Sequence, residues 1–229
     1  MRNESRTFVQ HYKTHRMKVH FILSAVLLLS SAAAVQAQTS DTDTRQRLIF
    51  GVKAGTNFSN VWDEEGDDFA ADGKFGFAGG VYFGIPAGTF IGFQPEILLS
   101  QKGFQASGTI GGTPYEVKRT TTYLDFPLQL QIKPAAFLTI LAGPQYSFLL
   151  QERNEYTFGA NSSVHQEDFN NDNIRKNILG FATGADINIS HVVVSTRFGW
   201  DFLSNHGDGS SSTPRYKNRW IQFTLGFKI

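Results

Sequence analysis

Five charged residues, each in a segment where every second residue is apolar, are the first candidates for chemistry. They are Lys53, Glu96, Asp125, Asp186 and Arg197. Because side chains alternate across a strand, all five are expected on the face opposite the apolar one. Two interpretations are open: a polar relay or narrow pore, or a salt-bridged plug. The plug is favoured, since the interior of a small closed barrel is just wide enough for its own side chains.

An acidic segment is the candidate for a cation site. Asp63-Glu64-Glu65-Gly66-Asp67-Asp68, with Asp72, offers clustered carboxylates of the kind that calcium prefers, but a solvated, self-repelling loop has the same composition. Residues 168–173 resemble the start of an EF-hand loop. Asn173 stands where that loop needs glycine, and Leu179 where it needs the closing glutamate. No metal site is therefore predicted.

A lipid-hydrolysing enzyme is another alternative. It would need a Ser/His pair with an acidic partner near the outer rim of a barrel. Three histidines are available beyond residue 37, namely His165, His191 and His206. His191 falls at a turn expected on the wrong side, and Ser204, His206 and Asp208 are ordinary loop residues. No catalytic residue, cofactor, phosphate-binding loop, zinc spacing or nucleic-acid signature is predicted.

The first 37 residues have the pattern of a secretory signal peptide. Arg16 and Lys18 precede an apolar and small-residue run over 21–34, and Val35-Gln36-Ala37 supplies a small-residue cleavage site. The run is too short for a transmembrane helix. We expect a signal peptide over 1–37, with Met17 as an alternative start, a polar leader over 38–47 and one domain over 48–229.

Composition narrows the class of that domain. The signal segment holds five of the 21 Lys and Arg residues and one of the 20 Asp and Glu residues, which leaves 16 basic and 19 acidic residues and a formal net charge of −3. This balance gives nucleic-acid binding no support. The chain has no cysteine, so it has neither a disulfide nor a lipoprotein anchor. Glycine and phenylalanine are abundant, at 22 and 21 residues, and mean hydropathy is −0.23. These values suit a transmembrane β-barrel better than a helical membrane protein.

Period-2 alternation predicts eight strands. The last is the clearest, with Ile221, Phe223 and Leu225 on one face and Gln222 and Thr224 on the other. The expected strands are Leu48–Phe58, Phe75–Ile85, Phe90–Gly103, Lys118–Lys133, Phe137–Gln151, Lys176–Ile187, Val192–Phe202 and Arg219–Ile229. Long connections are expected at Ser59–Lys74, Ser107–Pro114, Glu152–Asp172 and Leu203–Tyr216, alternating with short turns.

The alternation of long and short connections is typical of an outer-membrane barrel, with short periplasmic turns and long outer loops. A soluble barrel of the lipocalin type would need an apolar interior. Here the face opposite the apolar one carries Lys, Arg, Asp, Glu and Gln. Exposing these side chains to lipid would cost free energy. The sequence therefore predicts an all-β, eight-stranded, antiparallel, up-and-down transmembrane β-barrel. Pro95, Pro127 and Pro144 fall within strands, and bulges or strand ends are expected there.

Several segments carry a family resemblance that spans residues 48–229. They are Gly51-Val52-Lys53-Ala54-Gly55-Thr56-Asn57, Gln94-Pro95-Glu96-Ile97-Leu98-Leu99-Ser100-Gln101-Lys102-Gly103, Tyr123-Leu124-Asp125-Phe126-Pro127-Leu128, Ala142-Gly143-Pro144-Gln145-Tyr146 and the closing strand. In their order and spacing they resemble the PorT-like outer-membrane barrels of the Bacteroidota. The resemblance implies an eight-stranded barrel inserted by the barrel-assembly machinery. The namesake of that family is an accessory of a protein secretion system.

Taken together, these features predict an integral, non-enzymatic outer-membrane protein of a Gram-negative bacterium. It would contact outer-membrane lipid and act structurally or through its outer loops on envelope or external partners. A secretion-system accessory is the main alternative, and secretion-system proteins would then be its partners. A small-solute pore or a lipid-modifying enzyme is less favoured.

Overall fold

The computed structural model describes residues 44–63, 71–159, 161–168, 175–205 and 216–229. The predicted signal peptide lies outside these residues. A 3-10 helix, η1 (Thr44–Gln46), precedes the strands. The strands are β1 (Ile49–Asp63), β2 (Asp72–Pro86), β3 (Ile91–Ile110), β4 (Thr113–Ala135), β5 (Leu138–Phe158), β6 (Asn161–Asp168), β7 (Asn177–Ile189), β8 (Val192–Asp201) and β9 (Tyr216–Lys228). No helix among the described residues has the length and apolar character to cross a membrane.

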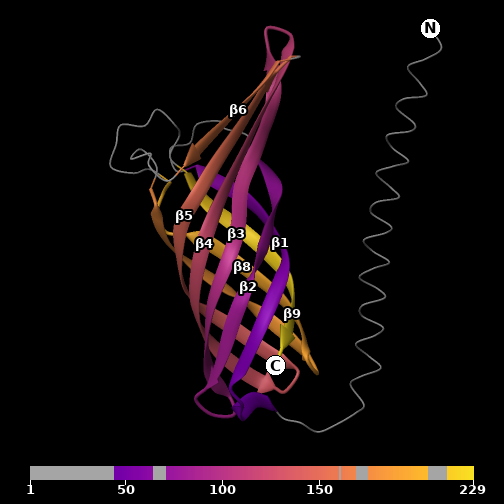
Figure 1. Ribbon diagram of the computed structural model, residues 1–229, viewed down its shortest axis with the longest axis vertical. Coiled ribbons are helices and arrows are strands. Elements are labelled where there is room, and N and C mark those ends of the chain that lie inside the picture. Colours follow the sequence, from indigo (N-terminus) through magenta and orange to yellow (C-terminus); the bar gives the residue numbers. More distant parts are fainter. Residues whose placement is uncertain (1–43, 64–70, 160, 169–174, 206–215) are drawn as a thin grey trace, which may run out of the picture. The chain divides into compact units, whose positions relative to one another are not determined.

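Eight of the strands close into an antiparallel ring. The order β4-β3-β2-β1-β9-β8-β7-β5 is completed by pairing of β4 with β5. The seam between the first and last strands runs from Gly51 opposite Lys228 to Asp63 opposite Tyr216. Figure 1 shows the strands running obliquely around this ring. The predicted all-β antiparallel sheet is thus confirmed.

The described residues form nine strands where the sequence predicts eight. The ninth, β6, pairs with β5 from Gln151 opposite Asp168 to Phe158 opposite Asn161. It occupies part of the predicted Glu152–Asp172 loop and remains outside the ring, which eight strands close. The sequence does not reveal it because its residues, Asn-Ser-Ser-Val-His-Gln-Glu-Asp, lack an alternating apolar face.

A second loop prediction is also wrong. Ser107–Pro114 is not a long connection, because β3 continues to Ile110 and β4 begins at Thr113. Gly111 and Gly112 make the two-residue turn, with φ of 58° and 82°. Two successive positive φ values are what a tight turn between twisted antiparallel strands requires, and glycine adopts them without steric cost.

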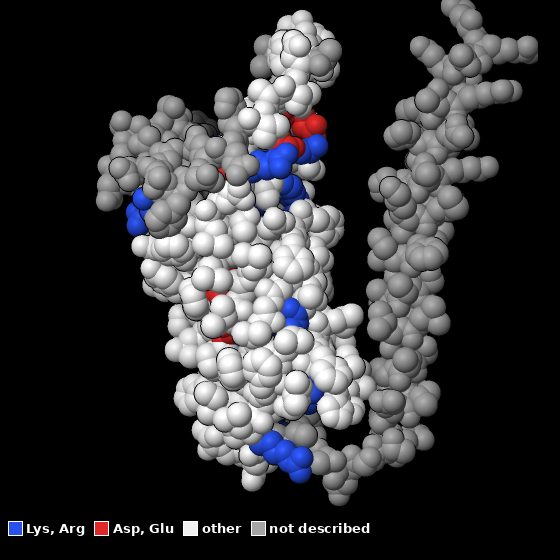
Figure 2. Space-filling view, viewed as in Figure 1, with Lys and Arg blue, Asp and Glu red and all other residues white. Residues whose placement is uncertain are grey.

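Burial is inverted relative to a soluble protein. The inward positions of the ring are mostly polar, and Lys102, Asp125 and Gln129 are each 1% exposed. The outward positions are large and apolar, with Phe223, Leu225 and Phe227 49–51% exposed. Figure 2 shows a broad, mostly uncharged middle zone with Lys and Arg gathered towards both ends. A continuous apolar surface of this kind needs an apolar solvent.

The strand registers do not shift at the three strand prolines, Pro95, Pro127 and Pro144. Pro95 keeps its pairing with Leu128 of β4, but the β2–β3 ladder skips from Tyr82–Glu96 to Ile85–Phe93. Pro127 and Pro144 likewise each keep a partner on one side only, on β5 and β7 respectively. The expected bulges are absent at these described positions, and the register shifts lie elsewhere. Each proline thus interrupts pairing towards a single neighbour, which its missing N–H explains.

Candidate functional site

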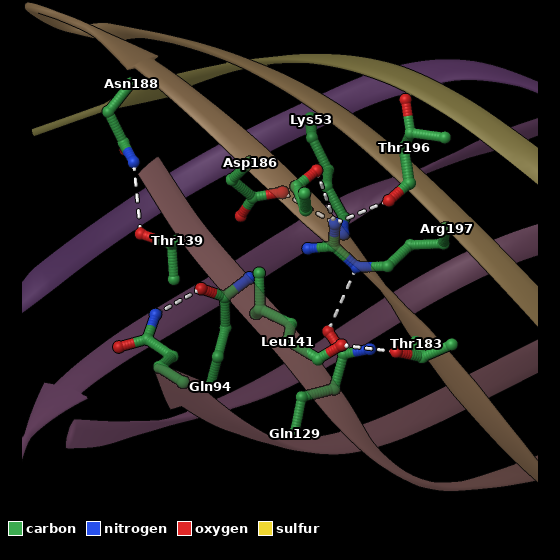
Figure 3. A network of polar contacts seen from close by, with 12 residues as sticks. Lys53, Gln94, Gln129, Thr139, Leu141, Thr183, Asp186, Asn188, Thr196 and Arg197 are labelled. Carbon is green, nitrogen blue, oxygen red and sulfur yellow. Dashed lines mark hydrogen bonds and ion pairs between the residues drawn. The ribbon is translucent and has the colours of Figure 1, made fainter. Parts of the chain in front are cut away.

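The polar interior of the ring holds the residues that the sequence singles out. Lys53 projects inward from β1, Glu96 from β3, Asp186 from β7 and Arg197 from β8, and all four are 3–4% exposed. Strand alternation places each on the inward face, because its two chain neighbours point outward. Figure 3 shows the guanidinium of Arg197 between Asp186 and Gln129, with Lys53 beside it.

These four residues form one charge-balanced group, which we call the interior quartet. Lys53 Nζ lies 2.5 Å from Glu96 Oε2, and Arg197 Nη1 lies 2.6 Å from Asp186 Oδ1. Arg197 Nη2, 3.7 Å from Glu96 Oε1, links the two pairs. Two cations therefore face two carboxylates inside a site from which water is largely excluded. Such burial is tolerated only when charges are paired in this way.

Glycines pair with the two cations across the strands. Lys53 pairs with Gly80 of β2, and Arg197 pairs with Gly184 of β7. A Cβ atom at Gly80 would lie 2.0 Å from the carbonyl oxygen of Ile97 on β3, and one at Gly184 would lie 1.9 Å from that of Thr196 on β8. Glycine at these two positions therefore allows the close backbone approach of neighbouring strands around the quartet.

Glutamines extend the hydrogen bonding of the quartet. Gln94 Nε2 donates to Glu96 Oε1 at 2.7 Å, and Arg197 Nε donates to Gln129 Oε1 at 3.2 Å. Gln131 Nε2 donates in turn to Gln94 Oε1 at 2.5 Å. Gln94 thus shares Glu96 Oε1 with Arg197, and Gln129 accepts from the guanidinium nitrogen that the ion pairs do not use. A network with this much internal bonding holds its side chains in fixed positions.

Asp125, the fifth predicted residue, belongs to a separate cluster. Its Oδ2 accepts a hydrogen bond from Ser100 at 2.6 Å and lies 3.3 Å from Lys102 Nζ. The ammonium of Lys102 also lies 3.8 Å from the ring centroid of Trp220 and 4.9 Å from that of Tyr123. Lys102 thus combines an ion pair with cation–π contacts. The structure brings four of the five predicted residues together and places Asp125 elsewhere.

A third cluster was not predicted from the sequence. Arg119 Nε donates to Asn154 Oδ1 at 2.7 Å and lies 3.3 Å from Glu152 Oε1, while its Nη1 donates to the hydroxyl of Tyr216 at 3.2 Å. Phe104 packs edge-on against Tyr216, with ring centroids 5.4 Å apart. Glu152 and Asn154 fell in a predicted loop. Both residues keep the period-2 spacing of the strand before them. Polar residues stand on both faces there, so no apolar face marks the segment as a strand.

The interior has little free space at the end where η1 lies. A cavity of about 20 Å³ there is lined by Arg45, Tyr82, Gln131, Lys133 and Lys228, among others. Lys133 Nζ donates to the carbonyl oxygen of Arg45 at 2.9 Å, which ties η1 to this end. A volume of this size holds about one water molecule. Together with the 1–4% exposure of the quartet, Lys102 and Asp125, this shows an interior occupied by side chains.

We expect no stepwise ion conductance when the full protein is inserted into a planar lipid bilayer. The side chains of the quartet, the Lys102 cluster and the Arg119 cluster are buried in the described interior, and packing of this kind opposes the passage of hydrated ions. A large porin inserted into the same membrane is the positive control. Resolved steps above the protein-free baseline, at insertion levels where the porin conducts, would contradict a filled interior.

The other predicted sites are only partly within the described residues. Most of the acidic segment at 63–68 and of the calcium-like residues 168–173 lies outside them, as do His206 and Asp208. The described residues contain no group of three His, Cys, Asp or Glu side chains able to hold a metal. His191 Nδ1 lies 3.1 Å from Ser190 Oγ at the exposed β7–β8 turn.

Comparison with known proteins places this geometry in context. A family model described as "Outer membrane protein beta-barrel domain" matches residues 36–207. No curated protein matches the chain.

Solved structures similar to this chain include three outer-membrane or surface proteins. Neisserial surface protein A is 11% identical with a TM-score of 0.45, and the match covers 79% of this chain and 97% of the neisserial chain. A major outer membrane protein of Thermus thermophilus is 14% identical with a TM-score of 0.45, covering 80% and 100%. Ail, the attachment invasion locus protein of Yersinia pestis, is 10% identical with a TM-score of 0.40, covering 79% and 98%.

Proposed function

The chain belongs to the outer membrane protein beta-barrel domain family, and from this we propose that it is a non-enzymatic outer-membrane protein that acts by binding partners outside the ring. The binding element would be the sheet that β3, β4, β5 and β6 form beyond the ring. Its partner would be an external or neighbouring envelope protein. Export by the predicted signal peptide and insertion by the barrel-assembly machinery belong to the same proposal.

The sheet beyond the ring, which we call the extension, is the observation that carries the proposal. It consists of residues 106–110 of β3, 113–122 of β4, 151–158 of β5 and the whole of β6. The four segments pair side by side, and Figure 1 shows them projecting at the upper end of the ring. Long external elements of a barrel are where its function commonly lies, because the ring itself is rigid and embedded in lipid.

The edges of the extension are open to further pairing. Among the described strands, β6 pairs with β5 alone, and β3 has no partner besides β4 beyond Gln105. The side chains of Ser162, Ser163 and Val164 are exposed on β6. An unpaired strand edge offers main-chain donors and acceptors to an incoming extended segment. The filled interior supports the same conclusion, since it disfavours transport as the function.

A second candidate is an accessory role in protein secretion. It rests on the PorT-like segments, whose order and spacing are specific, although the family match itself is broader. Such a subunit would act through its periplasmic turns, as at Ala136 between β4 and β5. Cargo proteins would then accumulate in the periplasm of a deletion strain.

One cross-linking experiment separates the two candidates. A photo-reactive amino acid is placed at Ser162 on β6, or at the exposed Ala136 in the opposite turn, in the full chain expressed in its native host. We expect a discrete protein adduct from position 162 and none from 136, because the extension is the proposed binding element. A shortened extension, with residues 106–117 and residues 156–163 each replaced by Asn-Gly, should leave the protein unable to complement a deletion strain. An adduct from 136 alone, with periplasmic cargo accumulation, would support the secretion role instead.

A further inference from the structure

A groove on the outer face of the ring lies between β8, β9 and β1. It has a volume of about 950 Å³. Its walls include Phe58, Trp62, Phe198, Trp200, Arg219 and Ile221. This volume lies within the range of small-molecule sites, about 300–1,000 Å³. The groove shares Trp220 with the Lys102 cluster and is separate from the extension and from the interior quartet.

An interruption in strand pairing accounts for its position. The last paired residues of β8 and β9 are Trp200 and Arg219, whereas β1 stays paired with β9 as far as Asp63 and Tyr216. The chain after β8 returns to β9 only at Asn205, whose N–H donates to the carbonyl oxygen of Tyr216 at 3.0 Å. Asp201 and Asn218, which flank this gap, both line the groove. They bond each other, with Asn218 Nδ2 donating to Asp201 Oδ2 at 2.7 Å.

The groove combines an apolar wall with cations at its edge. Phe58, Phe198 and Ile221 point outward and continue the apolar surface of the ring, with Phe58 and Phe198 40% and 50% exposed. Lys217 and Arg219 follow on the same face of β9. The guanidinium carbon of Arg219 lies 6.0 Å from the ring centroid of Trp62, which is 64% exposed. Tryptophan and arginine together mark the depth where hydrocarbon gives way to lipid headgroups.

The charge of Arg219 is not neutralised by the described part of the protein. No carboxylate among the described residues forms an ion pair with it, and its neighbours across the strands are Asn60 and Trp200. Asp201 lines the groove, but it is only 4% exposed and already bonded to Asn218. A guanidinium above an apolar groove is complementary to a ligand with an anionic head and a hydrocarbon tail.

We propose that this groove binds a phosphate-bearing lipid. Its phosphate would contact Arg219, and its acyl chain would lie along Phe58, Phe198 and Ile221. The groove is at the strand ends that adjoin the long connections, which face outward in barrels of this kind, so the lipid belongs to the outer leaflet. This inference goes beyond the proposed role of the extension and stands or falls independently of it.

Tryptophan fluorescence can report directly on this groove. The chain has three tryptophans, and Trp62, Trp200 and Trp220 all line it. The full protein, folded in a neutral detergent, is titrated with phosphatidic acid carrying brominated acyl chains, which quench tryptophan on contact. Phosphatidylcholine with the same brominated chains is the matched lipid. We expect half-maximal quenching at a mole fraction about fivefold lower for phosphatidic acid, the preference that one interfacial cation supplies.

Variants test whether Arg219 provides that preference. Arg219→Gln should bring the two lipids to equal potency, and Arg219→Lys should keep most of the difference because it keeps the charge. Arg153→Gln is the control, since Arg153 is an exposed arginine of the extension paired with Glu155 at 2.8 Å. Circular dichroism verifies that each variant retains its β-structure.

Three outcomes would overturn the proposal. The first is equal quenching of the wild-type protein by the two lipids. The second is an unchanged preference in Arg219→Gln. The third is loss of the preference on addition of millimolar inorganic phosphate, which would indicate a site for free anions and not for a lipid.

Discussion

Replacing Arg197 by methionine is expected to lower the free energy of unfolding by about 3–5 kcal/mol, the cost of removing one partner from a buried ion pair. Arg197 lies 2.6 Å from Asp186 and 3.7 Å from Glu96, and is 3% exposed. Methionine has similar length and no charge, so the interior quartet would keep one cation against two carboxylates. Lys53 would still neutralise Glu96, and Asp186 would lose its ion-pair partner. Urea unfolding of the protein in lipid vesicles, followed by tryptophan fluorescence, measures the loss.

A second substitution shows whether the loss comes from the uncompensated carboxylate. In the double variant Arg197→Met/Asp186→Asn the charges balance again, so it should be less destabilised than the sum of the two single variants. Arg153→Met is the control, because its pair with Glu155 is exposed and contributes about 1 kcal/mol or less. Additive effects in the double variant would show that Arg197 and Asp186 are not coupled.

Gly55→Ala is expected to destabilise the protein by about 3 kcal/mol by forcing apart the strands that close the ring. Gly55 of β1 is opposite Thr224 of β9 at the seam. A Cβ atom there would lie 1.9 Å from the carbonyl oxygen of Phe223 and 2.7 Å from Cα of Thr224. Both are backbone atoms, so no side-chain movement relieves the overlap. The same urea titration measures the loss, and slower electrophoretic migration without heating would report an unclosed ring.

Gly84→Ala is the matched control for the seam. Gly84 is another strand glycine, and a Cβ atom there would first meet Cβ of the Ile49 side chain, at 3.2 Å. This contact needs a shift of a few tenths of an ångström, so we expect a loss below about 1 kcal/mol. Equal urea midpoints for Gly55→Ala and Gly84→Ala would contradict the close approach of β1 and β9.

Side-chain direction was the part of the fold that the sequence could predict. Alternation assigned Phe223 and Leu225 to the outward face and Gln222 and Thr224 to the inward face, as observed. The same rule placed Lys53, Glu96, Asp186 and Arg197 on the polar side. This works because the period of a strand is two, so a single apolar face fixes the direction of every residue in it.

The extension was missed because alternation carries information only where the two faces meet different solvents. Residues 161–164 are exposed on both faces of β6, and the composition of residues 161–168 resembles that of a loop although their backbone pairs as a strand. The pairing of β6 with β5 is a main-chain interaction, which side-chain pattern does not encode.

The partners of the charged residues were decided by tertiary structure alone. Sequence gives the face on which Glu96 and Asp125 lie but not their depth, which depends on the stagger between strands around the closed ring. That stagger brings Lys53 across β2 to Glu96, and it brings Asp125 to Lys102 instead of Arg197. The sequence by itself determined an apolar exterior and a polar interior. Closure of the ring decided which charges meet, because only the closed sheet sets the height of each strand against its neighbours.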